Sequence, residues 1–545
     1  MAKKKNRKYI FIVGGVMSGV GKGITTSSIA KIVHSRGFSV TALKVDPYIN
    51  VDAGTMNPTE HGEVFVLADG DETDQDMGNY ERFLGTSFPS ANYMTTGRVY
   101  QSVIDRERAG GYKGKCVEVV PHIPLEILNR IKKAGKNAGA EVVITEIGGT
   151  IGEYQGLLFL EAARMLKMKH PEDVLFVLVS YVPFPNKIGE MKTKPTQYAS
   201  RTLNSAGIQA DVIVARSEIK LDDKRKEKIA MSCAVDKKSV ISAPDVDSIY
   251  HVPLNFEKDN LSNIILKKLA LKARKRDMGK WENFTKKIDN AKKTVKIGIV
   301  GKYFETGDFV LSDAYISVIE ALKHASYHYG CKPQLAWLDS SEYEKNPNKL
   351  KDLKEYDGIV VPGGFGSRGI EGKISVAKYC RENKIPYFGL CYGMQIAVIE
   401  FARNVANIKG AHTAEIDKQA PNLVIDIMPE QKEKLKKKDF GGSMRLGSYP
   451  AKIVKDTIAR GAYKKAEISE RHRHRYEVNP EYIEQIEKAG LVFSGKSPDG
   501  ILMEIAELPK TKHPFFLATQ FHPEFQSSPL VPHPLFKAFI KASKK

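Results

Sequence analysis

Short apolar runs rich in β-branched residues alternate with stretches of helical periodicity along the first half of the chain. The runs predict strands at residues 9–15, 39–47, 141–149, 173–183, 211–217 and 238–243, and segments of helix length separate them. Strands separated by helices are typical of a doubly wound, mostly parallel sheet. The first half is therefore predicted to be an α/β domain that binds ligands at the carboxyl ends of its strands.

The pattern changes after His251, where a charged, helix-forming stretch carries no strand signal. The alternation then restarts, with predicted strands at residues 295–303, 333–340, 357–366, 385–393 and 515–524. A length of 545 residues is too great for one core, which also favours two large domains. We predict a first domain over residues 1–270, a charged helical linker over 271–293, and a second doubly wound α/β domain over 294–545.

Composition narrows the setting in which the protein works. No run approaches the roughly 18 apolar residues that a membrane helix needs, and glycines and Lys22 break the apolar run that follows the basic start. Five scattered cysteines without a CxxC pair indicate a reducing compartment and no structural zinc, so we expect a cytoplasmic protein. The net charge of +20 would suit polyanions. Because the lysines are spread along the chain, we favour solvated helix faces over a nucleic-acid surface.

The stretch from Tyr9 to Val33 has the order strand, glycine-rich loop, lysine, helix that binds phosphates. It departs from the usual motif, because five residues separate Gly15 from Gly21 and because Gly23 replaces the Ser or Thr that normally follows the lysine. Without that hydroxyl, Mg²⁺ must be held by carboxylates elsewhere. Asp76 and Glu146 are the candidates, Glu146 because it ends an apolar strand; simple solvation is the alternative for acidic loop residues.

In the second half, Cys391 lies between Gly389 and Gly393, after an apolar strand and before an amphipathic helix. This spacing is that of a nucleophile elbow, and a helix N-terminus favours the thiolate. A buried structural cysteine is the alternative. His522 could act as a base oriented by Glu524, and Gly363 and Gly364 could offer backbone N–H groups to an oxyanion. Together these residues fill the roles required for acyl transfer through a thioester.

On these motifs, residues 295–545 resemble the class I (triad) glutamine amidotransferases, whose fold is flavodoxin-like. The resemblance implies that Cys391, His522 and Glu524 are the catalytic triad that releases ammonia from glutamine. Residues 44–66, 146–153, 192–203 and 245–253 resemble the P-loop amidoligase domain of the CTP synthase family, and residues 440–447 and 471–479 extend that resemblance through the second half. It implies a ligase of pyrimidine nucleotide synthesis: ATP phosphorylates O4 of UTP, and ammonia displaces phosphate to give CTP.

The same resemblance assigns substrate residues by position. It places ATP at Ser18, Gly19, Val20, Gly21, Lys22, Gly23, Ile24, Arg216 and Asp245, with Mg²⁺ at Asp76 and Glu146. It places UTP, and the triphosphate of CTP, at Ser18, Lys192, Thr193, Lys194, Pro195, Thr196, Gln197 and Lys228. It places glutamine at Gly364, Gln395, Glu415 and Arg475, and the gate of an ammonia passage at His61 and Val64.

Regulation and assembly are also implied by the family. GTP is expected to activate glutamine hydrolysis through Phe365, Arg368 and Arg473, and a homotetramer that can extend into filaments is expected. CTP feedback is expected at Glu153, Tyr154, Gln155 and Ser232. The family tends to read GDIE and FC where this chain has GEYQ and SC, which predicts weaker product inhibition. The alternative is that Tyr154 supplies a substitute ring.

Two other functions are alternatives to the one that this resemblance implies. A corrin-type amidating synthase also joins such a P-loop domain to a glutaminase, but it gives no reason for residues 192–197 or for a complete triad in this order. A partition-type ATPase that binds DNA would have no need of a nucleophile at Cys391.

Overall fold

The computed structural model describes residues 7–185, 187, 189–301, 305–306, 309–310, 312–364, 366–428, 431 and 442–544. Its backbone contacts form two compact units, Met1–Asp52 with Asp76–Thr285 and Ala53–Gln75 with Lys286–Lys545. Residues 53–75, which the sequence prediction counted in the first domain, thus group with the second unit. Among the helices of the described residues, none is long and apolar enough to cross a membrane.

The first unit is built on a seven-stranded sheet in which every neighbouring pair is parallel, as predicted. Its order is β5 (Tyr93–Thr95), β2 (Val40–Asp46), β6 (Val142–Ile147), β1 (Lys8–Gly14), β7 (Val174–Tyr181), β8 (Val212–Ser217) and β9 (Val240–Pro244). Along β1, Phe11 and Val13 enter one apolar core and Ile10 and Ile12 enter the other. Both faces are therefore covered, which explains the near-continuous apolar runs.

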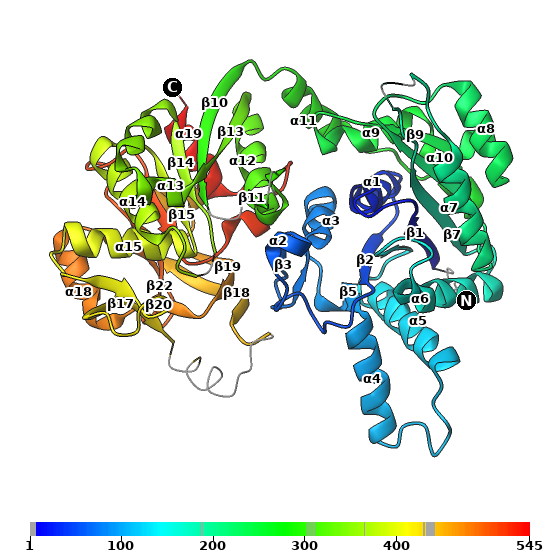
Figure 1. The fold of residues 1–545 in the computed structure, drawn as a ribbon, viewed down its shortest axis with the longest axis horizontal. Helices are drawn as coiled ribbons and strands as arrows, with labels where there is room; N and C mark the ends of the chain where they lie inside the picture. Colours follow the sequence, from blue (N-terminus) through cyan, green and yellow to red (C-terminus); the bar gives the residue numbers. More distant parts are fainter. Residues whose placement is uncertain are drawn as a thin grey trace. The chain divides into compact units, whose positions relative to one another are not determined.

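Helices cover the two faces of this sheet (Figure 1). One face packs against α4 (Thr96–Arg108), α5 (Val119–Asn137), α6 (Leu157–Lys169), α7 (Lys194–Ser205) and α8 (Asp223–Cys233). The other face packs against α1 (Lys22–Ser35), α9 (Val252–Lys258) and α10 (Leu261–Lys268). In α11 (Gly279–Asp289), within the predicted linker, the buried ring of Trp281 packs on Phe83 of α3 (Asp76–Leu84) and on Tyr250. This part of the linker therefore belongs to the first unit's core.

The second unit contains a nine-stranded sheet that is parallel on one side and antiparallel on the other. The order is β13 (Cys331–Asp339), β10 (Lys293–Gly301), β14 (Gly358–Val361), β15 (Tyr387–Leu390), β23 (Phe516–Thr519), β22 (Met503–Glu507), β21 (Val492–Lys496), β18 (Arg445–Ile453) and β19 (Glu467–His474). The five predicted strands are the parallel ones, β13 to β23. The four antiparallel strands were not predicted.

Helices again lie on both faces of the second sheet. The apolar core on one face includes α12 (Ile316–His328), α17 (Ile458–Tyr463) and α19 (Pro534–Ser543), and the core on the other includes α13 (Ser340–Lys345), α14 (Ile370–Asn383), α15 (Tyr392–Asn404) and α18 (Pro480–Ala489). A smaller sheet joins β16 (Ala411–Thr413), β17 (Asn422–Ile427) and β20 (Tyr476–Val478). The predicted fold class of two α/β domains is confirmed; the first sheet is wholly parallel, whereas four of the eight strand pairings in the second sheet are antiparallel.

Residues 53–75 form an inserted segment with α2 (Pro58–His61) and the antiparallel hairpin of β3 (Val64–Val66) and β4 (Glu72–Asp74). Arg471 of β19 donates to the carbonyl of Val66 at 3.0 Å, and Arg473 pairs with Glu72 at 2.8 Å. Gly447 has φ +90, and a Cβ there would lie 2.7 Å from the backbone nitrogen of Gly70. The hairpin is thus packed backbone to backbone against the second unit's sheet.

Candidate functional sites

The phosphate loop follows β1 and ends at Gly21, which has φ 91 and leads into α1. Lys22 is buried at the start of this helix, and its ammonium donates to the carbonyl of Gly149 at 2.8 Å. Burial lowers the pKa of Lys22, and the negative charge of Glu146 opposes this shift. The predicted loop residues 18–24 therefore lie at the carboxyl edge of the first sheet, with free backbone N–H groups of a helix start available for phosphates.

The structure explains why Gly23 replaces the usual Ser or Thr. A Cβ at position 23 would lie 1.8 Å from Oδ1 of Asp76, so the carboxylate of Asp76 occupies the space that a side chain would need. Asp76 is the first residue of α3, which packs beside α1. A carboxylate from another element thus stands where the ordinary motif has a hydroxyl.

Asp76 and Glu146, the two predicted metal ligands, are brought together around Lys44 of β2. The ammonium of Lys44 lies 2.5 Å from Oδ2 of Asp76 and 3.0 Å from Oε1 of Glu146, and Tyr80 donates to the other oxygen of Glu146. Burial raises the pKa of Glu146, and the charge of Lys44 opposes that shift. Lys44 was not identified from the sequence. Its signal was its place at a strand's carboxyl end, two residues before Asp46.

The donor set of this cluster fits Mg²⁺. Mg²⁺ is commonly held by one or two carboxylates together with substrate phosphates and water. Asp76 and Glu146 supply two carboxylates beside the phosphate loop. Among the described residues there is no group of three or more His, Cys, Asp or Glu that could hold a metal by themselves.

A pocket beside the phosphate loop joins residues that are far apart in the sequence. Gly21 and Ile24 line it together with Arg216 at the end of β8 and with Asp245, as the ATP prediction requires. Arg216 and Asp245 form an ion pair of 2.8 Å at its mouth. Apolar side chains complete the lining: Val246, Ile249, Val252 and Phe256. The pocket can therefore accept a flat, apolar-faced base next to a phosphate site.

Most of the predicted UTP residues lie at the start of α7, Lys228 lies on the neighbouring α8, and Ser18 lies in the phosphate loop. Residues 193–197 form the cap and first turn of α7, where Thr196 donates to the carbonyl of Tyr181 at 3.2 Å. Lys192 pairs with Glu190 at 2.8 Å, while Lys228 is exposed on α8. The hydrogen bond from Lys192 lowers the pKa of Glu190, and the charge of Lys228 adds to this shift. Lys192 and Lys228 therefore both act on the carboxylate of Glu190. Ser18 is exposed in the phosphate loop.

Three of the four predicted feedback residues lie in one turn. Glu153 accepts from the backbone of Thr150 and from the side-chain amide of Gln155, each at 3.0 Å. Tyr154 is 92% exposed. Ser232 is exposed on α8, and the described contacts do not join it to this turn.

Cys391 occupies the predicted elbow, with φ 51 and ψ −100, between β15 and α15. A Cβ at Gly393 would lie 2.1 Å from the carbonyl oxygen of Val361, so the turn requires glycine there. The backbone N–H of Cys391 donates to the carbonyl of Thr519 at 2.6 Å, and the amide of Gln520 lies 3.6 Å from the sulfur. This strained turn projects the thiol at the helix start.

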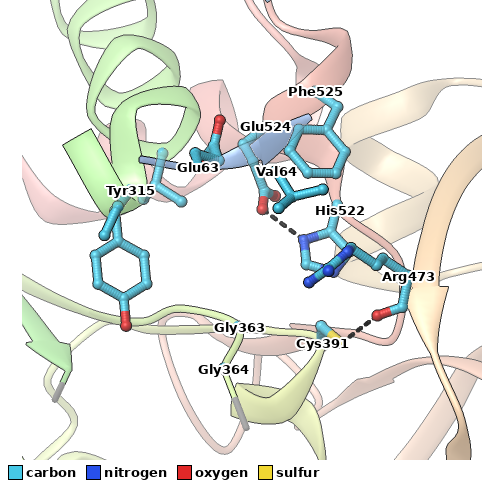
Figure 2. Close-up of a pocket in the computed structure, with 12 residues that line it drawn as sticks. Glu63, Val64, Tyr315, Gly363, Gly364, Cys391, Arg473, His522, Glu524 and Phe525 are labelled. Atoms are coloured by element: carbon cyan, nitrogen blue, oxygen red, sulfur yellow. Dashed lines mark hydrogen bonds and ion pairs between the residues drawn. The ribbon is translucent and has the colours of Figure 1, made fainter. Parts of the chain in front are cut away.

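His522 and Glu524 complete the predicted triad. Nδ1 of His522 lies 2.7 Å from Oε1 of Glu524, and Figure 2 shows the imidazole between Glu524 and the thiol of Cys391. Burial alone would lower the pKa of His522, but the charges of Glu524 and Cys391 outweigh it and raise the pKa to about 10. The ring also stacks on Phe525, with centroids 5.0 Å apart. His522 is therefore oriented and holds its proton firmly.

A pocket opens over the thiol and includes residues from the inserted hairpin. Its lining contains Gly363, Gly364 and Arg473 as well as Glu63 and Val64 (Figure 2). Val64, a predicted gate residue, thus lines the pocket, whereas His61 is exposed and outside this lining. Glu63 accepts hydrogen bonds from Ser317 of α12. Glu63 and Gln520 were not identified from the sequence.

Of the other predicted glutamine residues, none lines this pocket, and Gln395 is connected to Cys391 through Gln520. The side-chain amide of Gln395 donates to the carbonyl of Tyr476 at 3.2 Å. Glu415 accepts from the backbone of Gly366 at 2.8 Å, and Arg475 donates to Ser443 at 2.9 Å. Burial raises the pKa of Tyr476, the charge of Glu415 adds to the shift and that of Arg475 opposes it. Glu415 and Arg475 therefore lie near the same ring.

Of the three predicted GTP residues, Phe365 lies outside the described residues. Arg368 lies 3.7 Å from Asp339, whereas Arg473 lines the thiol pocket and pairs with Glu72. The described contacts do not bring Arg368 and Arg473 together.

Comparison with known proteins covers both halves of the chain. Residues 8–271 match the family model described as CTP synthase N-terminus, and residues 310–542 match the model for class-I glutamine amidotransferases. A protein from Carboxydothermus hydrogenoformans named CTP synthase is 52% identical and covers 99% of both chains. Proteins of the same name from Bacillus licheniformis and Pyrococcus abyssi are 50% and 51% identical, over 99% of this chain and 99% and 98% of theirs.

A solved structure, the glutaminase domain of Trypanosoma brucei CTPS with bound acivicin, is 39% identical, with a TM-score of 0.42, over 46% of this chain and 93% of that one. The full-length relatives share both the phosphate-loop half and the triad half, which leaves no support for a corrin-type synthase or a DNA-binding ATPase. Both halves of the chain therefore match the two parts of one glutamine-dependent ligase, and the chain belongs to the CTP synthase family.

Proposed function

We propose that this protein makes CTP from UTP, with ATP as the phosphoryl donor and with ammonia released from glutamine. One observation carries the proposal: a single chain holds both a complete Cys391–His522–Glu524 site and a phosphate loop beside Asp76 and Glu146. The first releases a nitrogen nucleophile and the second activates an acceptor for it.

In the glutaminase half, the sulfur of Cys391 attacks the carboxamide carbon of glutamine. The backbone N–H groups near Gly363 and Gly364, which line the pocket, are available to the oxyanion. His522 gives its proton to the leaving nitrogen, so ammonia departs and a thioester remains. Water then hydrolyses the thioester to glutamate and returns the thiol. The raised pKa of His522 supports this role, because the ring carries the proton that the leaving group needs.

In the synthetase half, the ammonium of Lys22 and the loop N–H groups bind the phosphates of ATP. The γ-phosphoryl group moves to O4 of UTP, ammonia attacks C4, and phosphate leaves. Mg²⁺ held by Asp76 and Glu146 would neutralise charge on the phosphates. Lys44 is placed to neutralise the same two carboxylates, and its charge opposes the rise that burial causes in the pKa of Glu146.

Further assignments are part of the proposal. The base of ATP binds at Arg216 and Asp245, which is supported by the pocket beside the phosphate loop. UTP binds at Lys192–Gln197 and Lys228, which is supported by the effect of both lysines on Glu190. Glutamine binds at Gly364, Gln395, Glu415 and Arg475, with Val64 and His61 at the start of an ammonia passage. GTP as activator, CTP as inhibitor, a homotetramer that can form filaments, and a cytoplasmic location come from the family resemblance.

The two-site proposal is tested with one nucleophile variant and two nitrogen donors. Cys391→Ala should abolish CTP formation from glutamine and leave formation from ammonium salts largely intact, because the thiol acts only in releasing ammonia. The assay follows the absorbance change as uracil becomes cytosine, with UTP, ATP and Mg²⁺ present.

Cys380→Ala is the matched control. Cys380 is also a fully buried thiol of the second unit, and burial raises its pKa far above the usual range, so it is chemically inert. This variant should keep both activities. Equal loss with glutamine and with ammonia in Cys391→Ala would overturn the two-site proposal.

A further inference from the structure

A second hollow of the second unit is lined by lysines and shares no lining residue with the pocket over Cys391. Its volume is about 940 Å³, within the range of small-molecule sites. Six lysines line it, and Asp456 is the one acidic residue of its lining. The lysines are Lys384, Lys464, Lys510, Lys512, Lys537 and Lys541.

These lysines come from four segments that are far apart in the sequence. Lys384 and Lys464 follow the C-terminal ends of α14 and α17, both with left-handed φ. Lys510 and Lys512 lie in the turn between β22 and β23, and Lys537 and Lys541 lie on α19. The fold therefore gathers cations at one place, where they repel one another.

The positive charge of the hollow is not balanced by nearby carboxylates. Within the part of the chain that the structure describes, none of the six lysines forms an ion pair, whereas Lys349, Lys488 and Lys496 of the same unit each pair with a glutamate. Lys537 and Lys541 are four residues apart on one helix, a spacing at which like charges destabilise the helix. A bound anion would remove this repulsion.

Lysines of the hollow act on the pKa of two histidines, His513 in the lining and His328 next to the lining residue Tyr329. Burial lowers the pKa of His513, and the charges of Lys384 and Arg381 lower it further. Burial also lowers the pKa of His328, with further contributions from Lys537 and Lys287. The lysines therefore make the potential positive at His513 inside the hollow, and Lys537 extends this effect to His328 outside the lining.

The lining also narrows the kind of anion. Lysine ammonium groups are point charges that bind phosphate, and no arginine is present in the lining to grip a carboxylate bidentately. Of the two aromatic residues, Phe515 is 1% exposed and the ring of Tyr329 is covered by the ammonium of Lys544 at 4.7 Å. Bases of a single-stranded nucleic acid would therefore find no ring on which to stack.

We propose that this lysine-lined hollow binds an oligophosphate, an anion with three or more charges carried on linked phosphates. Lysines spread at random over a basic protein are the alternative, and nucleic acid is the competing polyanion. The proposal does not depend on the reaction proposed above.

The test uses the full chain with ATP analogue and UTP at saturation, so that the nucleotide sites are filled. Inorganic tripolyphosphate is titrated into the wild type and into Lys537→Glu with Lys541→Glu, and binding is measured by calorimetry at low salt. Two charge reversals should weaken binding about tenfold or more. Glutaminase activity, which does not use α19, checks that the variant is folded.

Lys132→Glu with Lys136→Glu is the matched control, because these two lysines have the same spacing on α5 and lie outside the hollow. Binding in this control should equal that of the wild type. An equal loss in both variants, or no loss in either, would overturn the proposal. A loss seen with a dT oligonucleotide but not with tripolyphosphate would also overturn it, in favour of nucleic acid.

Discussion

A single carboxylate decides the chemistry of the phosphate loop. Asp76 fills the space beside Gly23, so the residue that normally supplies a metal-binding hydroxyl must here have no side chain. The same carboxylate is joined to Glu146 through Lys44. At the residue scale, the unusual glycine and the acidic pair are therefore one feature, and in the proposed site the oxygen that would bind Mg²⁺ lies on α3 instead of in the loop.

The first prediction follows from this exchange. Gly23→Ser restores the usual motif, yet it should abolish CTP synthesis with either nitrogen donor, because the new side chain and Asp76 cannot share one space. Glutamine hydrolysis should persist, since the triad lies in the other unit. Steady-state assays with glutamine and with ammonium salts measure both. Synthesis at a near wild-type rate would show that Asp76 is not needed where the structure places it.

The second prediction concerns pH and the pair of His522 and Glu524. The folded-state pKa of His522 is about 10 against an ordinary value of 6.5, so protonation of this ring stabilises the fold fully below pH 6.5 and progressively less up to pH 10. Glu524→Gln removes the charge that keeps the pKa high. The stability gap between wild type and variant should thus be widest near pH 6.5 and narrow toward pH 10.

Urea unfolding of both proteins at pH 6.5, 8 and 10 measures this gap. His522→Asn is the control, because a side chain that does not titrate should lose the same pH dependence. A gap that stays constant or widens as the pH rises would contradict the assigned pKa.

At the scale of elements, strand β19 contacts the inserted hairpin with one set of side chains and a buried polar cluster with the alternate set. Arg471 and Arg473 bind the inserted hairpin, at Val66 and Glu72. The alternate residues His472 and His474 turn the other way, as the period of a strand requires, and contact each other at 2.9 Å. Between them, the carbonyl of Arg473 lies 3.7 Å from the sulfur of Cys391. One strand therefore connects the hairpin, the thiol and a buried polar cluster.

That cluster centres on Arg445 of β18. Its guanidinium lies 3.2 Å from Glu477 and 2.8 Å from Glu504, and all three side chains are buried. Burial raises the pKa of Glu477 well above its usual range, the charge of Glu504 adds to this shift, and Arg445 opposes it. Burial likewise lowers the pKa of both histidines. The positive charge of Arg445 thus offsets the cost of burying the two glutamates side by side.

The third prediction is that Arg445→Met strongly destabilises the second unit. Removing one partner of a buried ion pair costs about 3–5 kcal/mol, because the other charge is left unpaired. Adding Glu477→Gln and Glu504→Gln to Arg445→Met should recover part of the loss. The free energy of unfolding in urea measures both variants. Arg445 would be merely a packing residue if the triple variant were less stable than the single one.

The strands differ in how well the sequence predicts them. The parallel strands were predicted, because burial on both faces leaves continuous apolar runs such as residues 173–183. Strand β19 has the sequence EISERHRH and carries no such signal, because most of its buried side chains are polar and are held by ion pairs and hydrogen bonds. The hairpin of residues 53–75 joins the second unit through contacts with β18, β19 and α12, all far away in the chain. Such long-range pairings leave no local pattern.

At the scale of the whole molecule, each half of the chain carries its own short motif, the triad in one half and the phosphate loop in the other. The triad and the phosphate loop could be predicted because each is a short motif with a fixed role, Cys391 on its elbow and Lys22 at a helix start. Lys44 and Glu63 were missed because their roles depend on what the fold places opposite them. The proposed regulation is an intermediate case, because the prediction rests on two residues that differ from those the family resemblance leads us to expect.

The proposed feedback site contains two such substitutions. Gln155 stands where the resemblance expects an acid, and its amide donates to Glu153 at 3.0 Å. Ser232 stands where a phenylalanine is expected and is exposed on α8. Losing a ring that stacks on a base costs about 1 kcal/mol, and exchanging a charged acceptor for an amide costs about as much. Inhibition by CTP should therefore be weak, unless Tyr154, which is 92% exposed, supplies another ring.

The fourth prediction is that Ser232→Phe with Gln155→Glu tightens inhibition by CTP by about thirtyfold, the equivalent of about 2 kcal/mol. The Michaelis constant for UTP should not change, since residues 192–197 and Lys228 are intact and the substitutions address only the cytosine and ribose of the product. Initial rates at rising CTP concentrations measure the inhibition constant. Met231→Phe, which adds a ring to the neighbouring, 87% exposed position of the same helix, is the control and should leave inhibition unaltered. If the double variant is inhibited no more tightly than the wild type, Tyr154 already fills the role, and the two substitutions carry no regulatory meaning.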